Sequence, residues 1–477
     1  MKNLWKAILP LVIGLMIVLV PTPDGLEPSA WQYFALFVAV IIALITEPLP
    51  AAAVGLIGIS LGAALNLVPS VPGTAPGTAD AVRWALSGFS NGTVWLIFGA
   101  FIFALGYEKS GLGRRISLLL IRILGRSTLG LGYAVALADL ALAPVTPSNA
   151  ARSGGTIYPI IKNIPPLYGS TPENEPRKIG GYLMWVALAT TCVTSTMFLT
   201  ALAPNLLAMS ILEKTVQLRF EWVEWFTALA PVCIPLFLLV PWLTYVIYPP
   251  TIKRSDDAPQ WAASELSKMG PVSRKEWTMA SLAVFALILW IFCGHLFNAT
   301  TVALMVVSLM IIFDVVSWPD ITGNKNAWNV LAWFGTLVAL ADGLAKVGFL
   351  KWFAALATSS MSGLPITALL LALVAMFFFV HYMFASLTAH TTALFPIILA
   401  TAAAVPGMPL RTLSLLLCAT LGLMGILTPY ATGPSPIYYG SGYISKKAFW
   451  TLGLVFGIIF IAVLLGVGYP YLRMIDF

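Results

Sequence analysis

The chain has 477 residues, of which 59% are hydrophobic and only 9% are charged. A soluble domain usually carries about a quarter charged residues, so the composition excludes a water-soluble globular protein. It predicts an all-α polytopic membrane protein, because a helix satisfies its own backbone groups in lipid. The formal net charge of +7 at pH 7 fits basic loops that face a cytoplasm, and we expect no nucleic-acid partner.

Apolar stretches long enough to cross a bilayer recur along residues 1–477, which we treat as a single membrane domain surrounded by lipid. They predict about 11 transmembrane helices. In chain order these helices lie at residues 5–21, 29–48, 51–68, 88–107, 182–205, 226–248, 278–296, 299–316, 328–345, 411–434 and 450–470.

Two further apolar stretches differ from these spans. Residues 127–161 and 363–399 are each too long for one helix, and polar or small residues interrupt both near the middle. We expect each stretch to be a re-entrant hairpin, which enters and leaves the membrane on the same side.

Basic residues set the predicted orientation. With the N-terminus inside, most of the 26 Lys and Arg residues fall on the cytoplasmic side of the predicted spans. The first hairpin then opens from the cytoplasm and the second from outside, and we expect a bacterial cytoplasmic (inner) membrane. A polar linker at residues 251–277 would be cytoplasmic, and it separates an N-terminal half, 1–250, from a C-terminal half, 278–477.

The two halves contain similar features in the same order. Residues 95–99 (Trp-Leu-Ile-Phe-Gly) parallel residues 331–335 (Leu-Ala-Trp-Phe-Gly), and a hairpin and then a span with a proline break follow in each half. An odd number of spans separates the paired features, which predicts two inverted-topology repeats. Such repeats with interrupted helices are typical of secondary transporters, whose substrate sites lie where the broken elements meet.

The middle of each hairpin has the chemistry of an anion site. Each tip places a helix N-terminus, with its partial positive charge, at membrane depth. Hydroxyl and amide donors are added there by Ser148, Asn149, Ser386 and Thr388. This combination suits a carboxylate, and two such tips around a pseudo-two-fold axis suit a molecule with two carboxylates.

Arg152 and His390 strengthen this interpretation, because each lies four residues after the serine of its tip. An arginine near the membrane centre costs about 3 kcal/mol or more, so it needs a partner such as an anionic substrate. The alternatives are that Arg152 snorkels or bonds backbone carbonyls, and that His390 is a buried hydrogen-bonded histidine. We expect His381 to pack in the interior and Asp139 to have a structural role.

At these residues the sequence resembles a known family, the divalent anion:sodium symporters. The hallmark of that family is a Ser-Asn-Thr motif at each of two hairpin tips, which here read Ser148-Asn149-Ala150 and Ser386-Leu387-Thr388. The strings TPSNAARSGGTIYPII and SLTAHTTALFPIIL are similar to the exchanger branch of the family. That branch includes bacterial citrate/succinate and tartrate/succinate antiporters and plastid 2-oxoglutarate/malate translocators. The resemblance covers essentially the whole chain.

The resemblance implies a homodimer in which each protomer has a scaffold domain and a mobile transport domain that carries the substrate by an elevator movement. The scaffold would come from the opening spans of each half, and the transport domain from the hairpins and broken helices. Substrate would meet the tips and the breaks. The residues involved are then Ser148, Asn149, Ala150, Arg152, Ser386, Leu387, Thr388, His390, Pro204, Asn205, Thr432, Gly433, Pro434 and Ser435.

Two departures from the family pattern affect the prediction of sodium coupling. In sodium-coupled members the Asn of both tips helps to form sodium sites, whereas here the second Asn is Leu387 and the first Thr is Ala150. Leucine offers no oxygen to an ion. We hypothesise that Arg152 and His390 replace sodium as counter-charges. The empty carrier would then move poorly, because an unpaired buried charge is costly, and exchange of one anion for another would be favoured.

The leading prediction is therefore a sodium-independent antiporter for di- or tricarboxylate anions of the succinate, malate, 2-oxoglutarate, tartrate or citrate class. The alternative is a sodium-coupled dicarboxylate symporter of the same family, and an anion channel is a third interpretation. We expect no enzyme activity, because no His-Glu-x-x-His motif is present. We also expect no metal or cofactor, because the four cysteines are scattered singly.

Overall fold

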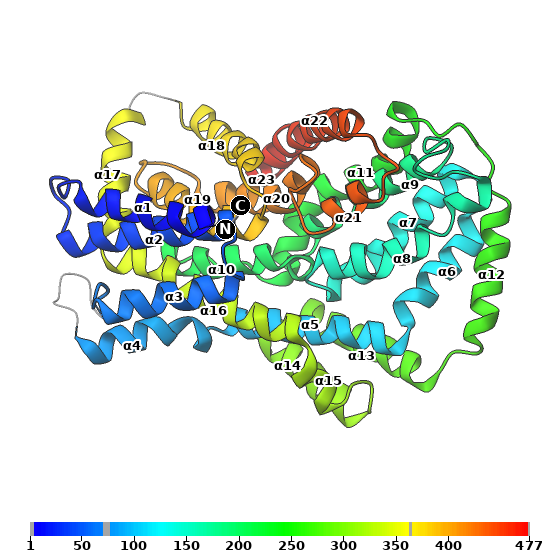
Figure 1. The fold of residues 1–477 in the computed structure, drawn as a ribbon, viewed down its shortest axis with the longest axis horizontal. Helices are drawn as coiled ribbons and strands as arrows, with labels where there is room; N and C mark the ends of the chain where they lie inside the picture. The colour runs from blue at the N-terminus through cyan, green and yellow to red at the C-terminus, as the bar shows by residue number, and fades with distance from the viewer. Residues whose placement is uncertain (1–3, 70–76, 362–364, 476–477) are drawn as a thin grey trace.

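The computed structural model describes residues 4–69, 77–361 and 365–475 (Figure 1). Within these ranges the chain forms helices and connecting segments without a β-sheet, and an isolated bridge joins Ser127 and Arg254. The all-α expectation is confirmed. Residues 363 and 364, with which the second expected hairpin begins, lie outside the described ranges.

Eight helical segments of the described chain are long and apolar enough to cross a membrane. They are Pro28–Thr46, Thr78–Ser110, Thr128–Val145, Trp222–Ile247, Arg274–Phe292, Lys325–Lys346, Ile366–Met383 and Lys446–Met474. Shorter apolar helices lie at Leu4–Leu19, Ala51–Ala64, Ala299–Ile312, Leu387–Ala403 and Leu410–Ile426. The polytopic character is confirmed, while the number of about 11 crossings stays a prediction.

One group of helices lies on the left of Figure 1 and has its own hydrophobic core. It contains α1 (Leu4–Leu19), α2 (Pro28–Thr46), α3 (Ala51–Ala64), α4 (Thr78–Leu86), α16 (Lys325–Lys346) and α17 (Phe349–Met361). The helix α1 packs on α2 outside the core, and α19 (Leu387–Ala403) contributes residues to it. Buried side-chain donors join α2 and α4 to α16, because the Tyr33 hydroxyl donates to the Leu340 carbonyl at 2.6 Å and the Trp84 indole to the Ala339 carbonyl at 2.9 Å. Both donors are therefore satisfied, as buried polar groups usually are.

The rest of the N-terminal half surrounds one buried helix. Its elements are α5 (Gly92–Ser110), α6 (Leu112–Leu124), α7 (Thr128–Leu142), α8 (Tyr158–Ile161), α9 (Gly180–Met197), α10 (Ala203–Val216) and α11 (Trp222–Ile247). All 18 residues of α9 are buried, and this helix packs against α7, α11 and α20 (Leu410–Leu423). A helix that is buried on every side needs no polar face toward solvent, which explains its nearly unbroken apolar and small-residue sequence.

In the described part of the chain, the C-terminal half continues through eight further helices. They are α13 (Arg274–Phe292), α14 (Ala299–Ile312), α15 (Trp318–Gly323), α18 (Ile366–Val380), α19 (Leu387–Ala403), α21 (Ser435–Gly440), and α22 (Lys446–Val463), which leads into α23 (Tyr469–Met474). The helix α19 packs against α10 and α17, so elements from the two halves of the chain interdigitate.

The expected polar linker at 251–277 contains a helix, α12 (Asp257–Met269), which lies at the right edge of Figure 1. Ala258, Ala262 and Leu266 recur at four-residue spacing and are buried, and α12 packs against α6. The Arg114 guanidinium also contacts the Glu265 carboxylate at 2.6 Å. The segment is therefore a packed helix with one apolar face, which the charges of the sequence alone do not indicate.

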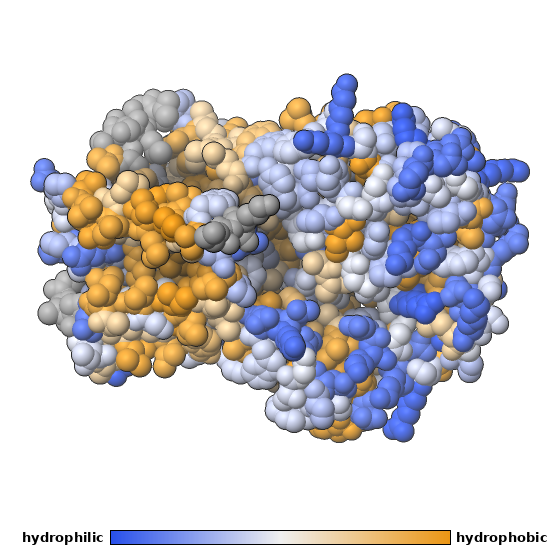
Figure 2. Space-filling view, in the orientation of Figure 1, coloured by the Kyte–Doolittle hydropathy of each residue, from blue (hydrophilic) through white to orange (hydrophobic). Residues whose placement is uncertain are grey.

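Figure 2 shows a hydrophobic surface on the left, over the α1 to α4 group, and a mostly hydrophilic surface on the right, over α12 and its surroundings. On α1 the side chains of Leu11, Leu15 and Leu19 are exposed at four-residue spacing. Such a stripe suits lipid rather than water.

Candidate functional site

The first hairpin turns where the sequence predicts. The helix α7 ends at Leu142, a short 3-10 turn follows at Ala143–Val145, and a helical segment with π geometry runs back over Ala150–Ile157. At the tip the Ser148 hydroxyl oxygen accepts from the Ala151 N–H at 3.2 Å, and the Ser148 carbonyl accepts from the Arg152 N–H at 2.8 Å. The hydroxyl therefore caps the returning helix and keeps its own proton free to donate.

The second tip has the same local geometry. The helix α18 ends at Val380, and α19 begins after Ser386, whose hydroxyl oxygen accepts from the Ala389 N–H at 3.3 Å. The Ser386 carbonyl accepts from the His390 N–H at 3.0 Å. The residue four positions after each serine, Arg152 or His390, thus occupies an equivalent backbone position in the two tips.

The first proline break lies against the first tip. The helix α9 ends at Met197 and α10 begins at Ala203, whose N–H donates to the Pro147 carbonyl at 2.8 Å. Pro204 stands in the first turn of α10, where its missing N–H costs nothing. The buried Asn205 amide donates to the Ser195 carbonyl at 2.8 Å, so it satisfies a backbone group that the break leaves without a helical partner.

The second break connects both tips. The Asn149 amide of the first tip donates to the Thr432 hydroxyl oxygen at 2.7 Å, and a Cβ on Gly433 would lie 2.7 Å from the Cβ of Ala150. One residue earlier, the Ala431 carbonyl accepts from Nε2 of His381, at the end of α18, at 2.8 Å. Residues 431–433 therefore contact both hairpins.

The same break continues into α21 through Pro434 and Ser435. Ser435 is fully buried, and its hydroxyl donates to the Gly425 carbonyl at 3.2 Å. Pro434 immediately precedes α21 and its carbonyl accepts from the Ile437 N–H. These two residues shape the break, and their contacts lie within the C-terminal half.

Arg152 is fully buried, and its guanidinium is surrounded by protein oxygens. Its Nε donates to an Asp139 carboxylate oxygen at 3.1 Å, and Nη1 donates to the carbonyls of Thr146 and Ala201 at 2.8 and 2.9 Å. The remaining partners of Nη2 are the hydroxyls of Thr191, Thr194 and Ser195, at 3.0–3.3 Å. In this conformation the guanidinium is saturated and has no donor left for a substrate.

The Arg152–Asp139 contact is a buried ion pair, with side chains 0% and 1% exposed. Thr194 also donates to the Asp139 carboxylate. A buried pair of this kind remains stable only when further hydrogen bonds satisfy both groups, as they do here for the guanidinium. Since the pair carries no net charge, Arg152 holds the first tip against α7 and α9 without adding a free positive charge.

His390 lies in an aromatic enclosure at the second tip. The rings of Phe377 and Phe384 lie 4.3 and 4.8 Å from the His390 ring, and the ring of His381 lies 5.1 Å away, measured between centroids. Nδ1 of His390 is 3.4 Å from Nδ1 of His381. Neighbouring Leu387 and Thr388 are buried, and the Thr388 carbonyl accepts from the Thr392 hydroxyl.

A cavity of about 1020 Å³ reaches the first tip. Its walls come from three parts of the chain: the C-terminal half of α5, the first tip with Ser148 and Ala150, and the N-terminal end of α16 with α15. At its rim the Lys109 ammonium lies 2.8 Å from the Asp320 carboxylate, and this hydrogen bond holds the pKa of Asp320 below its usual range. The exposed Lys325 also lines the cavity, so Lys109 and Lys325 both border the space that reaches the tip.

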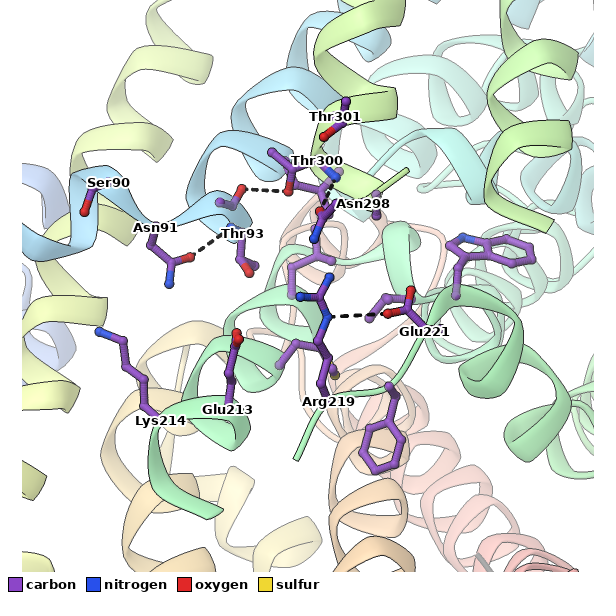
Figure 3. Close-up of a pocket in the computed structure, with 18 of the residues that line it drawn as sticks. Ser90, Asn91, Thr93, Glu213, Lys214, Arg219, Glu221, Asn298, Thr300 and Thr301 are labelled. Atoms are coloured by element: carbon purple, nitrogen blue, oxygen red, sulfur yellow. Dashed lines mark hydrogen bonds and ion pairs between the residues drawn. The ribbon is translucent and has the colours of Figure 1, made fainter. Parts of the chain in front are cut away.

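A second cavity, of about 730 Å³, lies at the opposite ends of the same two helices. Asn91, the N-cap of α5, lines it, and so does Asp342 near the end of α16, where Lys214 of α10 approaches within 3.6 Å. Figure 3 shows Arg219 directed toward Asn298, with Glu221 beside it. The antiparallel relation of α5 and α16 thus gives each helix one end in each cavity.

Helices are interrupted at both predicted tips and both predicted breaks, but sequence reasoning missed several of the side chains that contact them. Asp139 was expected to be structural, and it forms the ion pair of Arg152. His381 was expected to pack, and it contacts His390 and the second break. The hydroxyls of α9 had a visible signal, because Thr191, Thr194 and Ser195 recur at three- and four-residue spacing in an otherwise apolar helix.

The comparisons with known proteins agree with this architecture. Residues 1–476 match the family described as "Sodium:sulfate symporter transmembrane region". The chain is 47% identical over 480 residues to the citrate/succinate antiporter of Escherichia coli (strain K12), covering 99% of this chain and 98% of that protein. It is 48% identical over 478 residues to the L-tartrate/succinate antiporter of Shigella sonnei (strain Ss046), with the same coverage.

A solved structure supports the fold. The crystal structure of the Alcanivorax borkumensis YdaH transporter is similar with a TM-score of 0.56 and 16% sequence identity, over 88% of this chain and 97% of that one. Because the family match spans almost every residue and the relatives are nearly half identical, the chain is a multi-pass membrane protein that belongs to the sodium:sulfate symporter family, the divalent anion:sodium symporters.

Proposed function

We propose that this protein exchanges di- and tricarboxylate anions across a bacterial inner membrane, independently of sodium. The observation that carries the proposal is the identity of 47–48% over 99% of the chain to relatives named as citrate/succinate and L-tartrate/succinate antiporters. The geometry supports it, because the serine hydroxyls of both tips accept from the backbone and keep a proton to donate to a carboxylate.

The substrate site in this proposal consists of the two tips and the two breaks. Ser148 and Ser386 donate to the substrate, together with the backbone N–H groups at the helix N-termini behind them. Asn149 and Thr432 hold the first tip against the second break through their 2.7 Å bond. The cavity of about 1020 Å³ is the route by which an anion reaches the first tip from the cytoplasm.

The surroundings of Arg152 support sodium independence. Six protein oxygens, from carbonyls, hydroxyls and Asp139, surround its guanidinium, and oxygens of these types also bind hard cations. The guanidinium therefore takes the place of an ion at the first tip. At the second tip Leu387 supplies a hydrocarbon side chain where an ion would need oxygen. His390 occupies the position there that Arg152 occupies at the first tip.

We further propose that the two halves, 1–250 and 278–477, are inverted repeats joined by the linker at 251–277. The matching tip geometry and the antiparallel run of α5 and α16 between the two cavities support this. In an elevator movement the hairpins and broken helices slide against a scaffold of opening spans. The exposed stripe Leu11, Leu15 and Leu19 on α1 faces lipid or a second protomer in a homodimer.

Placement of the N-terminus in the cytoplasm follows from the distribution of Lys and Arg. The α12 segment, with Arg114 and Arg115 of α6 beside it, is then cytoplasmic. Arg115 is buried and binds the Glu276 carboxylate at 2.5 Å together with the Gly270 and Pro271 carbonyls, which fixes the start of α13 to α6.

A hydrolase motif occurs by chance in the chain and does not support an enzyme. Residues 88–92 read Gly-Phe-Ser-Asn-Gly, the spacing of a nucleophile elbow, which requires a strand before the serine. Here Ser90 ends a 3-10 turn between α4 and α5, and its hydroxyl donates to the Ser87 carbonyl at 2.9 Å. The relatives are named as antiporters, in agreement with transport.

The test is uptake of labelled succinate into proteoliposomes, with and without sodium, after loading the vesicles with unlabelled succinate or with buffer alone. We expect uptake only into succinate-loaded vesicles and no response to sodium. Uptake into empty vesicles driven by a sodium gradient would instead establish the sodium-coupled symporter. Uptake into empty vesicles without sodium, and without stimulation by internal succinate, would establish an anion channel.

A further inference from the structure

Nε2 of His390 is a buried polar atom without a hydrogen-bond partner among the described residues. The His390 residue is 0% exposed. Leaving a buried polar atom unpartnered costs about 1–3 kcal/mol, so this atom calls for a physical explanation. The position of His390, four residues after the serine of the second tip, makes a substrate-linked partner the natural one.

The hydrogen-bond partners of the two histidines assign their tautomers. Nε2 of His381 must donate, because its partner is the Ala431 carbonyl at 2.8 Å. In a neutral ring, Nδ1 of His381 is then the acceptor, and Nδ1 of His390 is the donor across the 3.4 Å between them. This leaves Nε2 of His390 without a proton, as a buried lone pair.

In the part of the chain that the structure describes, the two imidazoles contact uncharged groups. The His390 ring contacts the rings of Phe377 on α18 and Phe384 in the tip. Its titratable neighbour among the described residues is His381. His381 in turn meets the Ala431 carbonyl of the second break. The elements packed on α19 carry charged or titratable groups, several of which have partners elsewhere. Tyr33 on α2 donates to the Leu340 carbonyl, Lys214 on α10 and Lys346 on α16 both pair with Asp342 on α16, and Arg411 on α20 pairs with Glu224. The other such groups on these helices are Glu213 on α10, Lys325 on α16, Lys351 on α17 and Cys418 on α20.

A proton added to Nε2 of His390 would therefore create a buried cation without a protein partner. Such a charge is costly until an anion arrives beside it. We propose that His381 and His390 form a proton-binding pair, and that Nε2 of His390 takes up one proton from solution when a dicarboxylate binds at the second tip.

The step is simple in chemical terms. The neutral imidazole of His390 gains a proton and becomes an imidazolium, the substrate carboxylate accepts the new N–H, and both leave together when the anion is released. No other bond is made or broken. This inference rests on the proposed function, and it changes one part of it: the positive charge at the second tip travels with the substrate and is absent from the empty site.

His381 is the positioning residue in this scheme. By accepting from Nδ1 of His390 it fixes the tautomer that exposes the Nε2 lone pair, and it stabilises the imidazolium when that forms. Arg152 and His390, which occupy equivalent positions in the two repeats, therefore differ in how they carry charge. Arg152 carries a permanent charge with a permanent partner, Asp139, whereas His390 carries a charge only in the loaded carrier.

Calorimetry of substrate binding tests the proposal directly. The purified protein is titrated with succinate at about pH 7.5, above the ordinary imidazole pKa of about 6.5, in phosphate and in Tris, which differ strongly in heat of ionisation. Proton uptake makes the measured heat depend on the buffer. We expect a difference that corresponds to about one proton per bound succinate, and weaker binding as the pH rises, because the bound state holds more protons.

Three variants complete the experiment. His390→Gln and His381→Phe are expected to reduce the proton uptake per bound succinate to near zero. The matched control is His295→Gln, at the exposed third histidine, which should retain it. Equal heats in both buffers for the wild-type protein would overturn the proposal, even if a variant fails to fold, and so would undiminished uptake in a folded His390→Gln. Absence of any succinate binding would instead contradict the proposed function.

Discussion

The side-chain amide of Asn149 donates a 2.7 Å hydrogen bond to the hydroxyl of Thr432, although 283 residues separate the two in the chain. This bond joins the first hairpin of the N-terminal half to the broken span of the C-terminal half. One residue before Thr432, the Ala431 carbonyl accepts a hydrogen bond from His381 of the second tip. The site is therefore assembled by long-range contacts at a single three-residue segment, residues 431–433.

The close approach at this segment predicts the effect of Gly433→Ala. The added Cβ would lie 2.7 Å from the Cβ of Ala150, closer than two carbon atoms can approach, so the tip must shift away from the break. We expect a loss of about 1–3 kcal/mol in stability and a strongly reduced exchange rate. Ala150→Gly removes the opposing methyl group, so the double variant should recover both thermal stability and succinate exchange. Failure of this rescue would contradict the packing argument.

Breaking the Arg152–Asp139 pair should be severe from either side. Arg152→Ala leaves a buried carboxylate and Asp139→Ala leaves a buried guanidinium, and each is expected to cost about 3–5 kcal/mol and abolish exchange. The variant with both substitutions removes the two charges together and should be more stable than either single one. The measurement is thermal unfolding in detergent beside succinate exchange in proteoliposomes. Wild-type exchange by Arg152→Ala would exclude any essential role of this side chain.

The tip serines are expected to affect substrate affinity. Ser148→Ala and Ser386→Ala each remove a hydroxyl that caps a helix and retains a proton for a carboxylate, so we expect the KM for succinate to rise about tenfold, which corresponds to about 1.4 kcal/mol. Initial rates of exchange over a range of succinate concentrations measure this. Ser267→Ala, at an exposed serine of α12 outside both cavities, is the control and should keep the wild-type KM. Unchanged KM in both tip variants would show that the tips do not bind the substrate.

The second tip provides a separate test of sodium independence. Leu387→Asn restores the residue that sodium-coupled relatives carry, but a sodium ion needs several oxygens and one amide supplies a single ligand. We therefore expect exchange by this variant to remain indifferent to sodium, measured in paired assays with sodium and with choline. A clear sodium response would show that the remaining ligands of an ion site are already present around the tip.

Much of this architecture was open to prediction from the sequence, because its features are local. The turn of the first hairpin lies at Ser148, and α19 starts directly after Ser386. In the sequence both positions are marked by a serine that can cap a helix and by nearby residues that do not favour one. The breaks beside Pro204 and Pro434 are equally local, since each proline stands at the start of a short or resumed helix, a position that proline favours.

The partners across the site were not open to prediction in this way. A single sequence does not tell that Arg152 turns toward Asp139 and three hydroxyls of α9, because that choice depends on how α7, α9 and the tip pack together. The contact of His381 with His390 spans nine residues across a turn whose shape is set by the surrounding rings. The helix α12 was missed for another reason, because its charges conceal a four-residue apolar spacing.

The sharing of α5 and α16 between the two cavities has a pharmacological consequence. A bulky carboxylate that fills the cavity of about 1020 Å³ while engaging the first tip would press on Lys109 and Asp320 at its rim and wedge the ends of both helices apart. In the proposed inverted-repeat arrangement, where the two cavities open to opposite faces of the membrane, a compound too large to be carried would block the protein from one face only. The same anion supplied to the opposite face would meet the other cavity, lined by Asn91 and Asp342, and would need a different shape to inhibit.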